Sequence, residues 1–231
     1  MFLNDLLQPE NYRFERKFFI SSITSSQVEA IIKNHPSLFH EAFPVRCINN
    51  LYLDTLDMNH YWDNVNGVSK RVKVRIRWYG DLFGEISKPV LEFKIKNNAV
   101  GTKVNFALSP FILCDLIKLQ TLRERFSLLN ISGNLKSYLL SLNLSLMNSY
   151  SRKYYESADT KFRVTIDSGL QFFKLSPDYN LHFQPVETPV ATILELKYNQ
   201  RHDDMAESVS SYFPFRMTKS SKYVSGLNQF Y

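Results

Sequence analysis

The sequence predicts an α+β domain built as a closed antiparallel eight-stranded β-barrel with flanking helices. Eight segments with strand-like patterning are spread through the 231 residues, and several of them carry Lys and Arg on one face only. A closed β-architecture of this length commonly folds as one domain. No internal repeat, low-complexity tract or long Gly/Ser/Pro linker divides the chain, so residues 1–231 are expected to form a single domain.

The eight predicted strands alternate apolar and polar residues or are rich in β-branched and aromatic residues. They are Tyr12–Ile20, Ile48–Asp54, Val72–Tyr79, Val90–Lys96, Lys103–Ala107, Tyr150–Glu156, Lys161–Asp167 and Ala191–Tyr198. Eight strands are enough to close around a tunnel.

Helical segments are expected between and after these strands, most of them marked by a capping signal. They begin at a capping box of Ser26 and Glu29, at Ser109-Pro110, at Asp203 or Asp204, and near Ser220. The second segment is the longest, and we expect it to run with breaks to about Leu146.

Composition indicates a folded protein with an anionic partner. Hydrophobic residues make up 44% of the chain, which is enough for a core, and the formal net charge is +6. A positive charge fits nucleic acid, an anionic membrane or a phosphate compound. Cys47 and Cys114 match no metal spacing and are expected to be free thiols. The sequence shows no signal peptide and no apolar run long enough to span a membrane, so a cytoplasmic location is expected.

Lys and Arg dominate one face of several predicted strands. Residues two apart in a strand share a face, so Lys73, Arg75 and Arg77 lie together opposite a row of apolar residues. The same pattern includes Lys17, Lys94, Arg163 and Lys197.

A charged face is usually the solvated side of a sheet. These faces are biased to one sign, however, and their self-repulsion is relieved only by a bound anion. Arg residues at two-residue spacing also present planar forks suited to bidentate contact with phosphate. If the apolar faces pack outward against helices, the basic faces line a polar tunnel.

Taken in order, the motifs resemble those of the triphosphate tunnel metalloenzymes of the CYTH-like superfamily. The closest resemblance is to the VTC domain, the polyphosphate polymerase domain of the vacuolar transporter chaperone complex. The matching segments are YRFERKFFI, NLYLDTLD, KRVKVRIRWYG, LEFKIK, YSRKYY, FRVTID, ILELKY and SSKYVSGL, which together cover nearly the whole chain. The wider superfamily has Glu-x-Glu-x-Lys in its first strand. Here Arg13 replaces the first Glu and leaves Glu15 and Lys17.

The resemblance implies a cage of basic side chains around a phosphate chain. The residues expected to act in catalysis are Lys17, Arg75, Arg77, Lys94 and Lys222. Further phosphate contacts are expected from Arg152, Arg163 and Lys197. The implied carboxylate ligands of Mn²⁺ or Mg²⁺ are Glu195 and Glu15.

Other polar and aromatic groups leave two interpretations open. Glu92 and Asp167 are equally compatible with metal binding and with a role as counter-charges in a basic tunnel. Tyr79, Tyr150 and Tyr154 are candidates to cap a nucleotide, although filling space in the tunnel or its shell is the simpler interpretation.

The leading functional hypothesis is an ATP-dependent polyphosphate polymerase that transfers the γ-phosphate of ATP onto a phosphate chain. The alternatives are a triphosphatase or polyphosphatase, with water as the acceptor, and a non-catalytic polyphosphate-binding module. The expected partners are ATP or another triphosphate, polyphosphate and, by analogy with relatives, a separate membrane protein. Nucleic acid fits poorly, because a closed tunnel admits only a slender chain.

Overall fold

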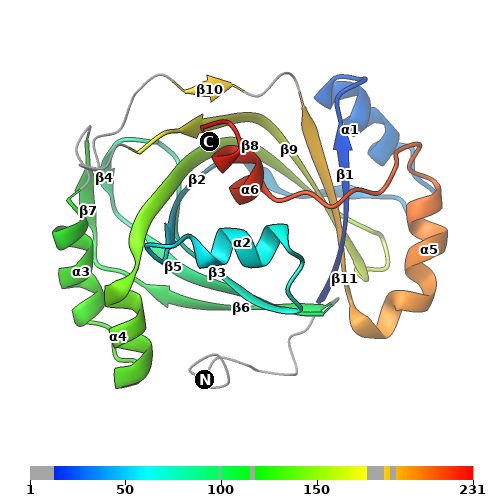
Figure 1. Cartoon of the computed structure of the whole chain (residues 1–231). Coiled ribbons are helices and arrows are strands. Elements are labelled where there is room, and N and C mark those ends of the chain that lie inside the picture. The colour runs from blue at the N-terminus through cyan, green and yellow to red at the C-terminus, as the bar shows by residue number, and fades with distance from the viewer. Residues whose placement is uncertain (1–12, 99, 115–117, 176–184, 188–190, 231) are drawn as a thin grey trace.

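The structure is a computed structural model that describes residues 13–98, 100–114, 118–175, 185–187 and 191–230 (Figure 1). Its strands are β1 (Arg13–Ile20), β2 (His40–Asp54), β3 (Lys70–Tyr79), β4 (Gly84–Ile86), β5 (Val90–Asn97), β6 (Val100–Ala107), β7 (Phe111–Leu113), β8 (Asn143–Glu156), β9 (Phe162–Phe173), β10 (Val186–Glu187) and β11 (Thr192–Asn199). Its α-helices are α1 (Ser25–Lys33), α2 (Asn59–Val65), α3 (Leu119–Ser127), α4 (Gly133–Ser141), α5 (Asp203–Ser211) and α6 (Lys222–Leu227).

Eight antiparallel strands form a ring, which confirms the predicted α+β class and the eight predicted strands. Their order is β9-β11-β1-β6-β5-β3-β2-β8, and β8 pairs again with β9. The shortest strand pairing in the ring is between β1 and β6, which share only the Arg13–Gly101 pair among the described residues. β10 extends one edge of β9, and β4 and β7 form a separate two-stranded sheet.

Two apolar cores cover the outside of the ring. On one side α1 and α5 pack on β1, β9 and β11 through buried residues such as Ile32, Val164 and Leu196. On the other side α3 and α4 pack with the β4–β7 sheet on β3 and β5, where Ile76 and Phe93 are buried. Because the apolar faces point outward to these helices, the basic faces turn inward, as the alternation predicted.

Helix α6 lies in the middle of the ring in Figure 1, where it meets a third apolar cluster. Tyr223 and Leu227 of α6 pack with Phe172 and Ile193 from the inner wall. Gly226 permits this approach, because a Cβ atom there would lie 2.5 Å from the ring of Phe172. In the described part of the chain, no helix is long and apolar enough to cross a membrane.

Several helix predictions need correction. The segment from Ser109 to Leu146 is not one broken helix, because it contains β7, α3, α4 and the start of β8. Leu144 and Leu146 alternate at the period of a strand, a signal that the surrounding Leu-rich sequence obscures. The capping box of α1 consists of Thr24 and Gln27.

The helix starts at the C-terminal end of the chain are closer to the prediction. Asp203 and Asp204 lie in the first turn of α5, whose N-cap residue is His202. The Ser221 hydroxyl accepts a hydrogen bond from the amide of Val224 and caps α6, close to the predicted start near Ser220.

Candidate active site

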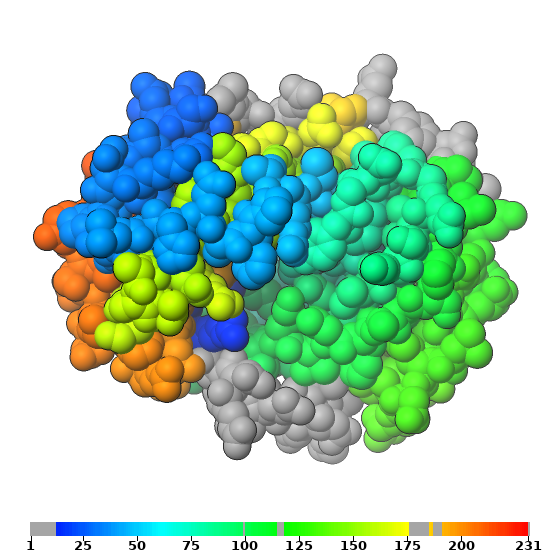
Figure 2. All heavy atoms as spheres, turned by 180° about the vertical axis from the view of Figure 1, so that it is seen from behind, coloured from blue at the N-terminus to red at the C-terminus, as the bar shows by residue number. Residues whose placement is uncertain are grey.

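The inward faces of the strands enclose a cavity of about 380 Å³. Eleven basic side chains line it: Arg13, Lys17, Lys73, Arg75, Arg77, Lys94, Lys96, Lys103, Arg152, Lys197 and Lys222. Among the described residues that line it, two are acidic, Glu15 and Glu195. Figure 2 shows the molecule from behind, where it is hollowed near the middle beside light-blue β2 and yellow-green β8.

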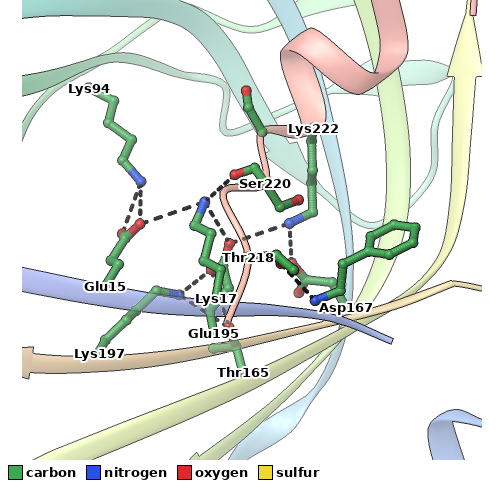
Figure 3. A network of polar contacts seen from close by, with 12 residues as sticks. Glu15, Lys17, Lys94, Thr165, Asp167, Glu195, Lys197, Thr218, Ser220 and Lys222 are labelled. Atoms are coloured by element: carbon green, nitrogen blue, oxygen red, sulfur yellow. Dashed lines mark hydrogen bonds and ion pairs between the residues drawn. The ribbon is translucent and has the colours of Figure 1, made fainter. Parts of the chain in front are cut away.

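Acidic and basic side chains alternate between β1 and β11. In the antiparallel register Glu15 lies opposite Lys197, and Lys17 lies opposite Glu195. The Lys17 ammonium is 3.4 Å from Glu195 and 3.8 Å from Glu15, so it joins the two carboxylates. Lys94 from β5 donates to both oxygens of Glu15 at 2.9 Å (Figure 3).

Glu195 is the most highly connected carboxylate of the cavity (Figure 3). It lies 2.7 Å from Lys197, 3.3 Å from Arg152, 3.4 Å from Lys17 and 3.5 Å from Lys222. Burial alone would raise the pKa of Glu195, but these four cations outweigh it and hold the pKa well below its usual range. Glu195 is therefore ionised.

Asp167 from β9 shares two cations, Arg152 and Lys222, with Glu195. It accepts two hydrogen bonds from the Arg152 guanidinium, at 2.5 and 2.6 Å, and lies 2.5 Å from the Lys222 ammonium. Burial lowers the pKa of Lys222, but Asp167 and Glu195 more than reverse this effect and raise it. Ser221 caps α6 at the residue before Lys222, so the helix start fixes the backbone from which Lys222 reaches Asp167 and Glu195.

A separate carboxylate, Glu92, holds the arginines of β3. The Nε of Arg75 donates to it at 2.8 Å, the Nη2 of Arg75 lies 2.6 Å from the same oxygen, and Lys103 lies 2.8 Å away. Arg77 lies 3.6 Å from Glu92, and it also donates to the side-chain oxygen of Asn50 at 2.9 Å. Glu92 thus keeps two neighbouring guanidinium groups in fixed positions along one wall.

Lys73 has no carboxylate partner among the described residues. Its ammonium donates to the Ser221 hydroxyl at 2.8 Å. Burial lowers the pKa of Lys73, and the nearby charges of Lys17 and Lys94 lower it further. A bound anion would therefore give Lys73 a counter-charge.

Nine of the ten predicted site residues line this one cavity, and Arg163 does not. Arg163 lies opposite Lys197 in the register, at the end of β9, with 55% of its side chain exposed. It pairs with Glu156 at 2.8 Å. The prediction that Arg163 lines the cavity is therefore wrong, because at the first residues of β9 its side chain pairs with Glu156 and is largely exposed to solvent.

The site also contains residues that motif matching had not singled out. Lys73 and Lys103 line the cavity beside the predicted arginines, and the alternation along β3 already placed Lys73 on the inner face. Glu92 and Asp167 bind cage cations, so their position supports the counter-charge interpretation.

The carboxylates offer a limited donor set for a metal ion. Within the described residues, no group of three or more His, Cys, Asp or Glu side chains could hold one. Glu15 and Glu195 do face the same cavity and share Lys17. Mg²⁺ is commonly bound by one or two carboxylates together with substrate phosphates. Glu15 and Glu195 are the two cavity carboxylates that would hold a divalent cation of that kind.

Comparison with known proteins decides the family. The family model of the VTC domain matches residues 12–231. The chain belongs to the VTC domain family. No curated protein sequence matches this VTC domain.

Solved structures share the fold of this VTC domain at low sequence identity. A proposed adenylate cyclase from Vibrio parahaemolyticus superposes with a TM-score of 0.53 at 10% identity, covering 94% of this chain and 98% of the other. The PH1012 protein of Pyrococcus horikoshii OT3 gives 0.52 at 11% identity, covering 94% and 99%. The PH1819 protein of the same organism gives 0.50 at 8% identity, covering 94% and 99%.

Proposed function

We propose that this VTC domain is an ATP-dependent polyphosphate polymerase that uses Mn²⁺ or Mg²⁺. The observation that carries the proposal is a ring of inward-facing cations in a chain that matches the VTC family along nearly its whole length. A cavity lined by eleven Lys and Arg residues fits a linear, highly charged phosphate chain. We further propose a cytoplasmic location and a separate membrane protein as partner.

The proposed reaction extends a phosphate chain by one unit. A terminal oxygen of the chain attacks the γ-phosphorus of ATP, the bond from that phosphorus to the β–γ bridging oxygen breaks, and ADP leaves with the electron pair. Phosphoryl transfer has a loose transition state with charge on the equatorial oxygens, so positioning and charge neutralisation supply most of the catalysis. Arg75, Arg77 and Lys222 would neutralise that charge, and Arg152, Lys197 and Lys17 would orient the two substrates.

The cavity carboxylates favour an ionised acceptor over an activated water. Neighbouring cations lower the pKa of Glu15, although burial alone would raise it, and the same balance holds for Glu195. Carboxylates with such low pKa values are poor proton acceptors. A phosphate chain needs no base, because its terminal oxygen is already charged. A divalent cation held between Glu15, Glu195 and the phosphates would add Lewis-acid polarisation of the γ-phosphate.

The test is turnover of ATP by the purified chain with Mn²⁺ or Mg²⁺, with polymer resolved on a gel and free phosphate counted separately. Formation of ADP with a lengthening polymer supports the proposal. Stoichiometric release of orthophosphate with ADP and no polymer would make the domain a triphosphatase. Tight polyphosphate binding without ADP formation, with either metal, would identify a binding module.

A further inference from the structure

One arginine and three aromatic rings cluster at the end of the cavity wall. The guanidinium carbon of Arg46 lies 5.3 Å from the ring centre of Phe43 and 5.5 Å from those of Tyr79 and Tyr154. Phe43 and Tyr154 also meet edge to face, with 5.8 Å between their ring centres. We refer to these four residues as the Arg46 cluster.

A bulge in β2 brings this cluster together. Phe43 lies opposite Tyr154 and Arg46 lies opposite Arg152, so three steps on β2 match two steps on β8. Such a bulge re-aims side chains, and here it brings Phe43 and Arg46 to the same group of rings. Residues three apart would otherwise point to opposite faces of the sheet.

The register connects the cluster to the phosphate-binding cavity. Tyr154 follows the cavity residue Arg152 by two positions on β8, and Tyr79 follows Arg77 by two positions on β3. Two positions along a strand correspond to about 6.5 Å and keep the same face. Burial raises the pKa of Tyr154 while the charges of Arg152 and Arg46 lower it, as expected for a ring between the two guanidinium groups. The cluster is thus a continuation of the inner wall.

The exposed groups of the cluster are available to a ligand. Tyr79 is 49% exposed and Phe43 is 48% exposed. Arg46 is exposed too, and within the described residues its side chain has aromatic contacts but no hydrogen bond or ion pair. Its five N–H donors are therefore unused. Stacked rings beside an arginine with unused donors combine a flat apolar surface with hydrogen-bond donors at its edge.

We propose that the Arg46 cluster binds the base of a nucleoside triphosphate whose phosphates lie in the cavity. The inference rests on the proposed function, because it assumes that a triphosphate occupies the cavity. A base would stack on an exposed ring, and the guanidinium would donate to its ring nitrogens or exocyclic oxygens. The ribose and the α-phosphate would cover the short distance back to Arg77 and Arg152. A phosphate group placed at the Arg46 cluster itself would need the guanidinium but would gain nothing from three aromatic rings.

Tripolyphosphate separates the two parts of this site, because it carries the phosphates of ATP without the base. We would measure the affinities of ATP and tripolyphosphate by calorimetric titration without divalent metal for the original chain, Arg46→Ala and Tyr79→Ala. The original chain should bind ATP more tightly than tripolyphosphate. Each variant should lose about tenfold in ATP affinity, which corresponds to about 1.4 kcal/mol and lies within the range for stacking of one base. Affinity for tripolyphosphate should not change.

Tyr212→Ala is the matched control. Tyr212 is 60% exposed and contacts His35 outside the cavity, so its loss should leave both affinities unchanged. Unchanged ATP affinity in both cluster variants would overturn the inference, and so would equal losses for ATP and tripolyphosphate, which would make Arg46 a phosphate contact. If the original chain binds neither ligand, the proposed function fails, and this inference fails with it.

Discussion

Replacement of Glu195 by Gln gives a sharp test of the cavity electrostatics. Glu195 contacts four cations, but three of them keep another carboxylate nearby. Arg152 and Lys222 keep Asp167, and Lys17 keeps Glu15. Among the described residues, Lys197 loses its carboxylate within 4 Å and keeps only the Thr165 hydroxyl at 3.2 Å. The cost of the substitution should therefore fall mainly on Lys197.

The magnitude follows from this count of partners. Removal of one member of a buried ion pair costs about 3–5 kcal/mol. Since one cation rather than four loses its carboxylate, we expect about 3 kcal/mol, the lower end of that range. For a domain of this size each kcal/mol corresponds to about 2–4 °C, so the melting temperature should fall by roughly 6–12 °C.

Bound phosphate should reverse this loss. Glu195→Gln makes the cavity more positive by one charge, so tripolyphosphate should bind more tightly to the variant and close the stability gap. Turnover of ATP with Mn²⁺ or Mg²⁺ should be lost, because Glu195 is a proposed metal ligand. Thermal denaturation with and without tripolyphosphate, beside a turnover assay, measures all three effects.

Glu29→Gln is a suitable control for Glu195→Gln. Glu29 pairs with Lys33 and Lys153 outside the cavity, so Glu29→Gln should lower the melting temperature. Tripolyphosphate should raise the melting temperature of this variant no more than it raises that of the original chain. Full ATP turnover by Glu195→Gln across a Mn²⁺ titration would show that Glu195 is only a counter-charge. A stability gap that tripolyphosphate leaves open would refute the electrostatic reasoning itself.

Three further predictions follow from the same geometry. Arg75→Ala and Arg77→Ala should each weaken tripolyphosphate binding by about 1.5–3 kcal/mol, the range for hydrogen bonds to charged groups. Unchanged affinity of both variants in calorimetric titration would contradict a phosphate-binding role for these arginines. Burial lowers the pKa of Lys94 to about 8, although Glu15 opposes it, and bound phosphate should raise the pKa again. Tripolyphosphate affinity should therefore fall as pH rises from 7 to 9.5, and proton uptake on binding, measured in two buffers, should decrease in Lys94→Arg. Tyr223→Phe removes the 2.5 Å hydrogen bond to Asp54 and should lower the free energy of unfolding by about 1.5–3 kcal/mol. An unchanged midpoint of urea denaturation would contradict a stabilising role for this hydrogen bond.

The inward basic faces could be predicted because side-chain direction in a strand depends only on local alternation. Arg75, Arg77 and Lys94 therefore reach the cavity as expected. The position of Arg163 could not be predicted in this way, because alternation gives the face of a strand but not where the ring wall ends. That limit depends on the pairing of β9 with β8 and β11, which joins residues far apart in the chain.

The Arg46 cluster shows a second limit of sequence-based inference. Tyr79 and Tyr154 were already candidates to cap a nucleotide, since they extend the inner faces of β3 and β8. Phe43 and Arg46 were not, because they precede the predicted strand Ile48–Asp54, and their spacing of three residues does not fit regular alternation. Only the bulge opposite β8 resolves the contradiction, and a bulge depends on the partner strand as much as on the residues it contains.

The distribution of carboxylates explains how so basic a cavity can fold without its ligand. Each of the four acidic residues contacts at least two cations: Glu15 contacts Lys17 and Lys94, and Asp167 contacts Arg152 and Lys222. Glu92 contacts Arg75, Arg77 and Lys103, and Glu195 contacts Lys197. The cations still outnumber the carboxylates, and Lys73 is left with a hydroxyl alone among the described residues. A phosphate chain would therefore complete the charge balance around Lys73 without having to displace any ion pair that holds the ring together.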